Sequence, residues 1–413
     1  MSLVLTNRFE LEKSHTLNVY EETGGYASLQ KLFSLKPEKV VEEVKKSGLR
    51  GRGGAGFSAG MKWSFIDKKS GKPRYLCINA DESEPGTFKD RYLMEKDPHQ
   101  LIEGIIITCY AIESHVCYIY IRGEFDLSYR RIQQAVAEAY ERGFLGKNIF
   151  GKGYDLEVIV HRGAGAYICG EETALLESLE GKRGNPRIKP PFPAIVGLFG
   201  CPTIINNVET ISAVPFILRY GADAYRKWGT EKSPGTKLFS VSGHVKKPGC
   251  YEVPLGYPLK DFLEKECGSI SGTGRLKAVI PGGSSVPVLT AEEALSVNLD
   301  YEALAAKGSM LGSGGVIVID DSVDMVWALK NLSTFYAHES CGQCTPCREG
   351  TGWINQILQR FYRDGGTKED LALLNEISDN MQGKTICVLA DALAMPVRSY
   401  IKKFPEDFTK HLR

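Results

Sequence analysis

The sequence has no long hydrophobic run, no excess of either charge and no cluster of histidines. Its longest apolar stretch, Ile105 to Ile112, is far shorter than the roughly 18 residues that a membrane-spanning helix requires. Its 51 basic and 50 acidic residues leave a net charge of +1, which provides no field to attract nucleic acid or an anionic membrane. We therefore expect no nucleic-acid binding and no direct membrane insertion, so any membrane contact would be made through partners.

Several catalytic signatures are also missing. The seven histidines are dispersed, and the chain contains neither the G-x-S-x-G turn of serine hydrolases nor the Walker A phosphate loop. Hydrolase and P-loop ATPase activities are therefore set aside. The N-terminus carries no secretory signal, and most of the 11 cysteines occur singly, so we expect a reducing compartment, the cytoplasm.

What the sequence does contain is a compact cysteine motif. Cys341, Cys344 and Cys347 follow one another at two-residue intervals, and Cys387 stands alone in a later run that otherwise predicts helix. Three closely spaced thiols plus a remote fourth are typical of a cubane iron–sulfur cluster. Four thiolates also bind zinc, but zinc ribbons usually pair one C-x-x-C with a second. The spacing favours a cluster and electron transfer, with zinc as the alternative.

The chain is long enough for several domains. Its 413 residues exceed the roughly 250–300 at which one hydrophobic core stops growing. Between residues 75 and 161, short β-rich runs alternate with helical patterns, one opening at Asp97-Pro98 and one capped by Asp126. This alternation predicts an α/β domain with a largely parallel sheet. The next stretch, 182–202, is a Gly- and Pro-rich loop of a length that is usually functional.

The pattern changes twice after that domain. Between about residues 236 and 320, short strands and turns predict a small, separate β-rich domain. The rest of the chain predicts a helical bundle with the cysteines in its loops and helix ends. Its helical patterns lie at 324–338, 348–363, 367–381 and 388–403. We therefore predict domains at 1–235, 236–322 and 323–413.

A glycine-rich motif precedes the first predicted strand. Gly51, Gly53 and Gly56 satisfy G-x-G-x-x-G, a pattern that places backbone amides close to a phosphate. The standard dinucleotide fingerprint must follow a strand, whereas this motif follows a helical pattern at 40–47. It therefore predicts a phosphate-binding turn of another kind, or only a connection that needs glycine for positive φ.

Polar loops follow two of the predicted strands. Asn79 to Gly86 contains three acids directly after the first strand, and Arg162 to Thr173 is rich in glycine and acids after a later one. A third polar element contains Asn206 and Asn207. Ligands of open α/β sheets bind beyond the carboxyl ends of the strands, so these loops are candidates to bind ribityl or ribose hydroxyls. Solvated acidic turns remain the alternative.

Taken together, the motifs resemble a known family. They are Arg-Gly-Arg-Gly-Gly-Ala-Gly-Phe at 50–57, Asn-Ala-Asp-Glu-Ser-Glu-Pro-Gly at 79–86, Gly-Glu-Glu-Thr at 170–173 and Glu-Ser-Cys-Gly-Gln-Cys-Thr-Pro-Cys-Arg-Glu-Gly at 339–350. In this order they resemble the F subunit of bacterial respiratory complex I, the flavoprotein that binds NADH and FMN. The resemblance implies an α/β fold with a Rossmann-like FMN and NADH domain, a β-grasp-like domain and a helical bundle carrying a [4Fe–4S] cluster.

The resemblance also assigns roles to residues at the matching positions. Expected cofactor contacts, to FMN, are Gly51, Gly53, Gly54, Lys62, Asn79, Asp81, Glu82, Gly170, Glu171, Asn206 and Asn207. Expected NADH contacts are Phe57, Phe65, Glu84, Glu172, Lys189 and Phe192, with the phenylalanines stacking on adenine and Lys189 near the diphosphate. Expected cluster ligands are Cys341, Cys344, Cys347 and Cys387. Ser58-Ala59 stands where many relatives have Pro-Thr.

The function that this resemblance implies is electron entry into NADH:quinone oxidoreductase. Hydride passes from NADH to FMN, and single electrons pass through the cluster to partners, with no side chain required as a general acid or base. The implied partners are the thioredoxin-like [2Fe–2S] protein of the complex, its E subunit, and a larger iron–sulfur protein, its G subunit. The implied location is the cytoplasmic side of the inner membrane, reached through these partners. Alternatives are a diaphorase subunit of an NAD-linked hydrogenase or formate dehydrogenase, and a zinc-stabilised scaffold without catalytic activity.

Overall fold

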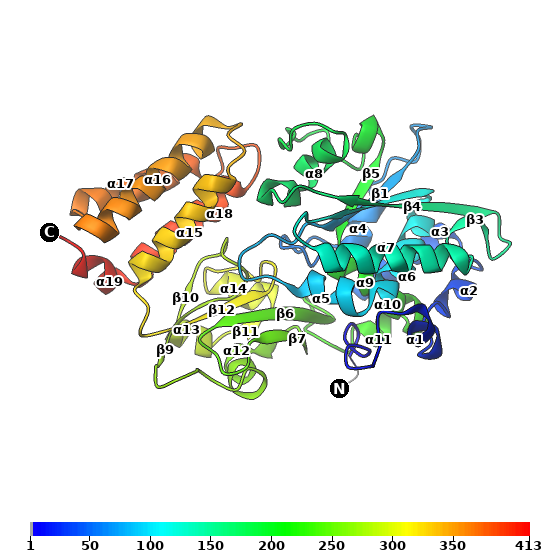
Figure 1. Cartoon of the computed structure of the whole chain (residues 1–413), viewed down its shortest axis with the longest axis horizontal. Helices are drawn as coiled ribbons and strands as arrows, with labels where there is room; N and C mark the ends of the chain where they lie inside the picture. The colour runs from blue at the N-terminus through cyan, green and yellow to red at the C-terminus, as the bar shows by residue number, and fades with distance from the viewer. Residues whose placement is uncertain (1–2) are drawn as a thin grey trace.

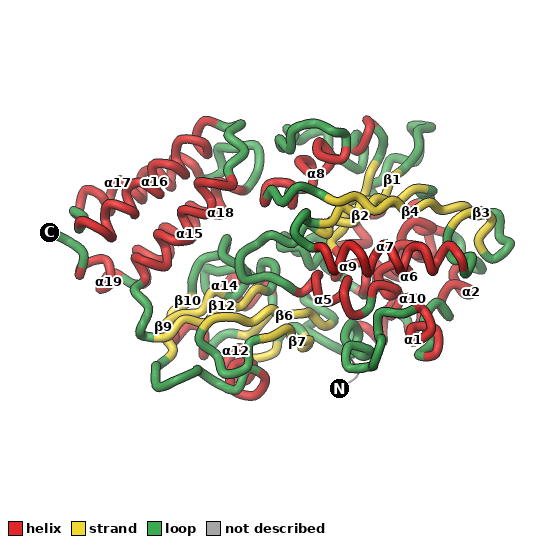
Figure 2. Tube along the Cα trace, viewed as in Figure 1, coloured by secondary structure: helices red, strands yellow, loops and turns green. Residues whose placement is uncertain are grey.

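The computed structural model describes residues 3–413 and folds them into three parts (Figure 1). A parallel sheet with its helices forms the first part, a smaller sheet forms the second, and C-terminal helices form the third. In Figure 2 the strands of the two sheets lie in separate layers, while the C-terminal part is drawn only as helices and loops. The expected order of an α/β part, a β-rich part and a helical bundle is confirmed.

The first sheet has five strands in the order β3-β4-β2-β1-β5. Strands β4, β2, β1 and β5 are parallel, and β3 pairs antiparallel with β4. The bounds are β1 Tyr75–Ala80, β2 Val116–Ile121, β3 Gly146–Ile149, β4 Tyr154–Arg162 and β5 Thr203–Asn207. The largely parallel sheet was predicted correctly, but β3 and β5 were not predicted as strands.

Helices cover both faces of this sheet. Figure 1 shows α5, α6, α7 and α9 along one face and α8 on the other. The helices of the first part are α1 Leu17–Glu22, α2 Ser28–Leu32, α3 Pro37–Ser47, α4 Ala59–Ser64, α5 Lys89–Lys96, α6 Pro98–Ile112, α7 Asp126–Glu141, α8 Glu172–Leu179, α9 Val208–Ser212, α10 Val214–Tyr220 and α11 Ala222–Tyr225. Two short 3-10 turns are η1 Tyr167–Gly170 and η2 Leu198–Gly200.

Alternation along the strands explains why both faces are covered. In β1, Leu76 and Ile78 belong to the apolar core that includes α6, whereas Cys77 belongs to the core that includes α8. Successive side chains of a strand point to opposite faces, so a strand buried on both sides is apolar throughout. The run Tyr75-Leu-Cys-Ile78 is therefore a central strand.

Local signals place some of the helix ends. Gly48 has a φ of +69° and ends α3, a conformation that glycine adopts without steric cost. Ser58 caps α4 by accepting a hydrogen bond from the Met61 amide, so the serine at this position is a suitable N-cap. The predicted cap at Asp126 was wrong by one residue: Phe125 occupies the N-cap position, and Asp126 is the first residue of α7.

The second part is built on another five-stranded sheet, in the order β10-β9-β12-β6-β7, with a two-stranded pair β11-β8 beside it. Its strands are β6 Thr236–Gly243, β7 Gly249–Pro254, β8 Tyr257–Pro258, β9 Leu276–Ile280, β10 Leu289–Thr290, β11 Asn298–Leu299 and β12 Gly315–Asp320. Its helices are α12 Leu259–Asp261, the π-helix η3 Phe262–Glu266, α13 Ala291–Leu295 and α14 Tyr301–Ala306. Phe239, Phe262 and Val318 lie in its own apolar core.

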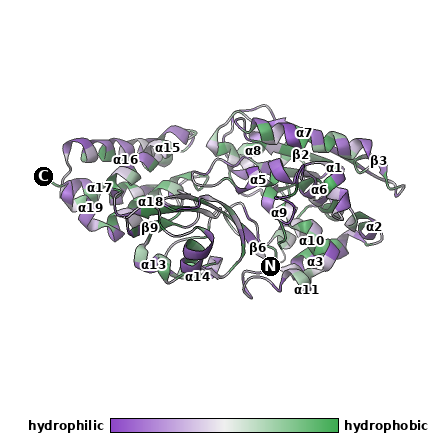
Figure 3. Cartoon of the chain, turned by 60° about the horizontal axis from the view of Figure 1, so that its bottom comes forward, coloured by the Kyte–Doolittle hydropathy of each residue, from purple (hydrophilic) through white to green (hydrophobic). Residues whose placement is uncertain are grey.

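The third part contains α15 Met325–Glu339, α16 Thr345–Asp364, α17 Lys368–Met381, α18 Leu389–Lys403 and α19 Pro405–Lys410. The four predicted helices are present, and α19 was not predicted. Cys387 was predicted within a helical run but lies in the bend before α18. Helix α16 buries Ile354, Leu358 and Phe361 at helical spacing, and it carries both hydrophilic and hydrophobic residues in Figure 3. Within residues 3–413, no helix is long and apolar enough to cross a membrane.

Candidate functional site

The strand order of the first sheet creates a topological switch point, where open α/β sheets form a crevice. Strands β2 and β4 follow on one side of β1, whereas β5 lies on its other side, so the connections diverge between β1 and β5. Ligands of open α/β sheets bind at such a switch point, outside the carboxyl ends of the strands. The register places Asn79 of β1 directly beside Asn207 of β5. Two of the predicted cofactor contacts therefore meet at the switch point.

The glycine-rich loop lies against this point. A Cβ atom on Gly53 would lie 3.2 Å from the Cβ of Asn207, closer than most such contacts, so a side chain here would push the loop and Asn207 apart by a few tenths of an ångström. The loop is closed by a hydrogen bond from the Gly51 amide to the Phe57 carbonyl, at 2.8 Å. Gly54 has a φ of +132° and open space around it. The loop follows α3 rather than a strand, as the sequence indicated, and its backbone is held beside the strand ends.

Arg52 anchors this loop to the protein interior. Its side chain is buried, and its guanidinium donates to the Tyr225 hydroxyl and to the carbonyls of Pro234 and Thr236, at 3.0–3.2 Å. Its backbone amide donates to the Thr210 hydroxyl at 2.8 Å. The positive charge therefore faces the protein interior, and what the loop offers a phosphate is its backbone amides and glycines.

Asn79, Asp81 and Gly170 form the next part of the site. The Asn79 side-chain amide donates to the Gly170 carbonyl at 2.7 Å and so joins the loops that follow β1 and β4. A Cβ on Gly170 would lie 3.5 Å from Oδ2 of Asp81, a buried oxygen for which residues 3–413 provide no hydrogen-bond partner. Burial raises the pKa of Asp81 to about 7, although Arg122 opposes this. An unpaired buried carboxyl in a glycine-lined crevice fits a ligand with hydroxyl or ring N–H groups.

The raised pKa of Asp81 gives a prediction. The folded protein holds this proton up to about pH 7, whereas the unfolded chain releases it near 3.8, so rising pH lowers the stability across that window. Asp81→Asn removes the ionisation. The advantage of asparagine should therefore grow by about 2–3 kcal/mol between pH 5 and pH 8. Urea unfolding of flavin-free protein measures this, with exposed Asp223→Asn as control. A pH-independent difference would contradict the assignment.

Four charged side chains stand at the start of α8. Lys62 pairs with Glu172 at 2.8 Å, and Lys189 pairs with Glu171 and Glu172 at 3.0 and 3.1 Å. Glu171 also caps α8 by accepting from the amides of Thr173 and Ala174. Burial alone would raise the pKa of Glu172, but the two lysines outweigh it and lower that pKa. Glu172 is therefore a fixed carboxylate, a suitable acceptor for ribose hydroxyls.

Three predicted aromatic contacts lie at the surface. Phe57 and Phe65 are 54% and 52% exposed, and their ring centroids are 6.3 Å apart. Phe192 is 58% exposed, on the loop that also carries Lys189. Exposed rings of this size are available to stack on a base. The structure therefore pairs the rings of Phe57 and Phe65.

Two predicted acids are engaged by other groups of the chain. Glu82 accepts from the amides of Asp90 and Arg91 at the start of α5. Glu84 is held by Tyr167, Ser284 and Ser285, where the second part of the chain meets the first. Burial raises the pKa of Glu84.

Sequence reasoning missed two residues that support the site. Trp63 donates its indole N–H to the predicted contact Asn206 at 2.8 Å and is fully buried. Tyr167 donates its hydroxyl to Glu84 at 2.8 Å. The one sequence feature that could have indicated Tyr167 is its position as an aromatic residue in the glycine-rich loop after β4.

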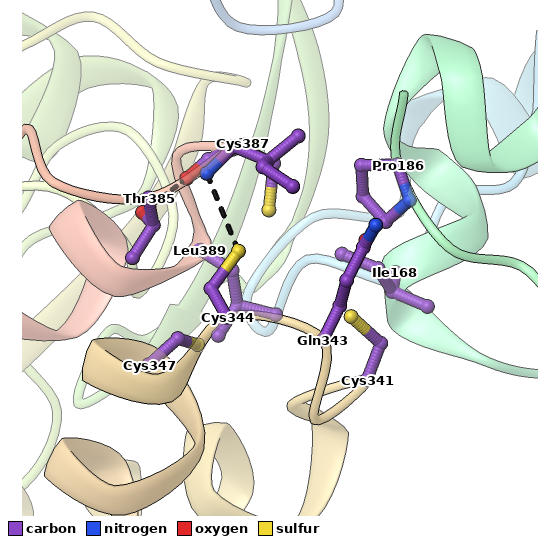
Figure 4. Close-up of a pocket in the computed structure, with 10 residues that line it drawn as sticks. Ile168, Pro186, Cys341, Gln343, Cys344, Cys347, Thr385, Cys387 and Leu389 are labelled. Carbon is purple, nitrogen blue, oxygen red and sulfur yellow. Dashed lines mark hydrogen bonds between the residues drawn. The ribbon is translucent and has the colours of Figure 1, made fainter. Parts of the chain in front are cut away.

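The four cysteines of the motif line one cavity (Figure 4). Cys341, Cys344 and Cys347 come from the start of α16 and the loop before it, and Cys387 comes from the bend before α18. The lining also includes Ile168 and Pro186 from the first part. The dashed contact in Figure 4 joins the Ile386 amide to the Cys344 sulfur, at 3.4 Å.

The donor set of this cavity fits a cluster. Burial raises the pKa of the Cys387 thiol to about 12 and also raises that of Cys347. Such thiols become thiolates only when a cation replaces the proton. Within residues 3–413, no three Cys, His, Asp or Glu side chains converge closely enough to hold a single metal ion. The four thiols surround a shared cavity, which is how a polynuclear iron–sulfur cluster is bound.

Comparison with known proteins assigns the three parts to families. Residues 44–216 match the family described as the Nuo51 FMN-binding domain. Residues 237–319 match the SLBB domain, and residues 327–411, which include all four cysteines, match the NADH-ubiquinone oxidoreductase-F iron-sulfur binding region. These matches define a flavin-binding chain with an iron–sulfur region at its C-terminal end.

Relatives that align over nearly the whole chain identify the family within this class. The chain is 52% identical over 410 residues to an F subunit of NADH-quinone oxidoreductase, designated F 2, from Rhizobium meliloti (strain 1021), covering 99% of this chain and 97% of the relative. It is 53% identical to the NADH-quinone oxidoreductase F subunit of Streptomyces coelicolor (strain ATCC BAA-471 / A3(2) / M145), covering 99% and 91%. The chain belongs to the family of NADH-quinone oxidoreductase F subunits.

Solved structures agree in fold. A chain of the NAD⁺-reducing [NiFe]-hydrogenase, solved in the H₂-reduced state, superposes with a TM-score of 0.86 at 35% identity. The match covers 99% of this chain and 66% of the hydrogenase chain. The same fold therefore occurs in a longer chain of a different enzyme complex.

Proposed function

We propose that this chain is the electron-entry subunit of an NADH:quinone oxidoreductase. It binds FMN and NADH at the carboxyl edge of the first sheet and carries a [4Fe–4S] cluster on Cys341, Cys344, Cys347 and Cys387. When bound, the flavin accepts hydride from NADH, and the cluster carries single electrons. The observation that carries the proposal is the turn η1. Ile168 of this turn lines the cysteine cavity, while Gly170 of the same turn contacts Asn79 at the switch point.

The side chains of this chain would bind and orient. Gly51, Gly53 and Gly54 would admit the flavin phosphate close to backbone amides, and Asn79 and Asn207 would hydrogen-bond the flavin from two adjacent strands. Glu172, fixed by Lys62 and Lys189, would accept from the ribose of NADH. Phe57 and Phe65 would stack on the adenine. No side chain is assigned as a general base, since hydride transfer requires none.

The proposal extends to partners and domains. With domain boundaries at 1–235, 236–322 and 323–413, the first domain would bind FMN and NADH, and the third would carry the [4Fe–4S] cluster. A member of this family belongs to a larger complex, and its proposed neighbours are the thioredoxin-like [2Fe–2S] E subunit and the larger iron–sulfur G subunit. These would hold the chain at the cytoplasmic side of the inner membrane.

A visible spectrum tests the function directly. Anaerobically purified protein should show a flavin band beside a broad iron–sulfur absorbance, and one equivalent of NADH should bleach the flavin band. A flavin band absent even after FMN is added, with zinc bound in place of iron, would reject the proposal in favour of a zinc-stabilised scaffold.

A second candidate is a diaphorase subunit of an NAD-linked hydrogenase or formate dehydrogenase, and the match to the hydrogenase chain supports the first of these. Both candidates predict the same spectrum. They differ in what co-purifies with the chain from its native source: a quinone-reducing complex in the first case, and a hydrogenase or formate dehydrogenase activity in the second.

A further inference from the structure

The turn η1 makes three separate contacts, two of which lie at the proposed electron-entry site. The Tyr167 hydroxyl donates to Glu84 at 2.8 Å, Ile168 lines the cysteine cavity, and the Gly170 carbonyl accepts from Asn79 at 2.7 Å. This turn therefore links the flavin crevice to the cysteine cavity. Any residue that holds the turn in place would help to set the spacing between the two sites.

One acid from the bundle holds the start of this turn. Oε2 of Glu339 accepts a hydrogen bond from the Tyr167 backbone amide at 3.0 Å, although the two residues are 172 positions apart. Ala166, which precedes the turn, provides no side-chain cap. The first amides of a helical turn have no partner within it, so Glu339 replaces the missing cap from another part of the chain.

The placement of Glu339 is unfavourable for its own helix. It is the last residue of α15, where the helix dipole disfavours a negative charge. The basic side chain nearby, His338, is 3.5 Å from Oε1 and is 85% exposed, so this pair contributes little. The hydrogen bond with Tyr167 therefore explains why an acid stands at this position better than the interactions within α15 do.

Two further contacts join the same surfaces. The Tyr167 ring packs edge-on against Phe335 and Tyr336 of α15, with centroid distances of 5.1 and 5.9 Å. Glu339 is followed at once by Ser340 and Cys341, the start of the cysteine loop. A shift of the end of α15 relative to η1 would therefore move the first thiol relative to the flavin crevice.

We propose that Glu339 is a positioning residue that clamps η1 against the cysteine loop and so fixes the spacing between the flavin site and the four thiols. The proposal rests on the function proposed above. It assigns Glu339 no contact with NADH, flavin or iron, and the residue acts through the backbone of Tyr167.

Hydrogen exchange of the holoprotein tests the clamp. In Glu339→Ala, the amide of Tyr167 should exchange about tenfold faster, because a charge-assisted hydrogen bond is lost. Glu339→Gln retains a weaker, neutral acceptor and should exchange at an intermediate rate. Glu376→Ala, which removes an exposed acid of α17 in the same bundle, is the matched control. Should Glu339→Ala fail to fold, the comparison of Glu339→Gln with Glu376→Gln decides the question.

Separate measurement of flavin bleaching and iron–sulfur bleaching tests whether Glu339 acts by positioning. Bleaching of the flavin band by NADH should be unchanged in Glu339→Ala, while the following bleaching of the iron–sulfur absorbance should slow about tenfold, as expected for a small misplacement. General destabilisation would slow both steps. Iron content equal to that of the control would exclude cluster loss as the cause.

The outcomes separate this proposal from the function on which it rests. Exchange and transfer rates equal to those of the Glu376 control, in protein that NADH still bleaches, would overturn the clamp and leave the function standing. Unmodified protein that NADH fails to bleach would reject the function, and the exchange rate at Tyr167 would still report whether Glu339 holds the turn.

Discussion

Replacing Cys387 by alanine is expected to abolish the iron–sulfur absorbance while leaving NADH-driven bleaching of the flavin band intact. Cys387 comes from the bend before α18, whereas the other three thiols come from the cysteine loop and the start of α16. Removing it takes away the one thiol ligand that closes the cavity from that side. The bound iron should fall by more than about tenfold, since disturbing a metal site typically costs 10–100-fold in affinity.

The main test of this prediction is that Cys387→Ala removes the cluster without affecting the flavin. The flavin crevice lies at the strand ends of the first sheet, and none of its predicted contacts is a cysteine. Cys201→Ala is the control, because Cys201 is also half-buried and lies outside the cavity. Iron and zinc analysis with the visible spectrum measures the outcome. Full iron content in Cys387→Ala, or loss of iron in Cys201→Ala, would contradict the ligand assignment.

The order of folded parts was predictable because its signals are local. Strands such as β2 are apolar runs bounded by turn residues, and the bundle helices repeat apolar residues at helical spacing. The cysteine spacing and the glycine-rich loop are likewise continuous in sequence. These features placed the crevice and the cavity within the correct parts of the chain.

Features that depend on contacts between distant segments were not predictable. The contact of Glu339 with Tyr167 joins a side chain to a backbone amide. The residue type at position 167 does not indicate that its backbone amide makes such a contact. Glu82 resembles a ligand in its motif, and the hydrogen bonds that it accepts at the start of α5 appear only in the folded chain. Cys387 lies beside a helical pattern, and the bend that precedes α18 is visible only once the chain is folded.

The second large effect concerns the choice of nucleotide. Glu172→Gln is expected to raise the ratio of kcat/KM for NADPH to that for NADH by about ten- to a hundredfold. Glu172 would face the ribose of the adenosine, where a 2′-phosphate brings a second negative charge. Like charges about 5 Å apart repel by roughly 3 kcal/mol at an effective dielectric constant of about 20, and the nearby lysines reduce this.

The two lysines strengthen the prediction. In the unmodified chain, Lys62 and Lys189 are paired with Glu172, at 2.8 and 3.1 Å. Once the carboxylate is neutral, Lys62 is released from this pairing and Lys189 retains only Glu171, so repulsion of a phosphate is lost while attraction by Lys62 is gained. Glu177→Gln is the matched control, because Glu177 lies on the same helix but pairs with Arg187. Steady-state rates with both nucleotides and ferricyanide as acceptor measure the ratio. An unchanged ratio would show that Glu172 does not contact the ribose, and the nucleotide would then have to bind away from the start of α8.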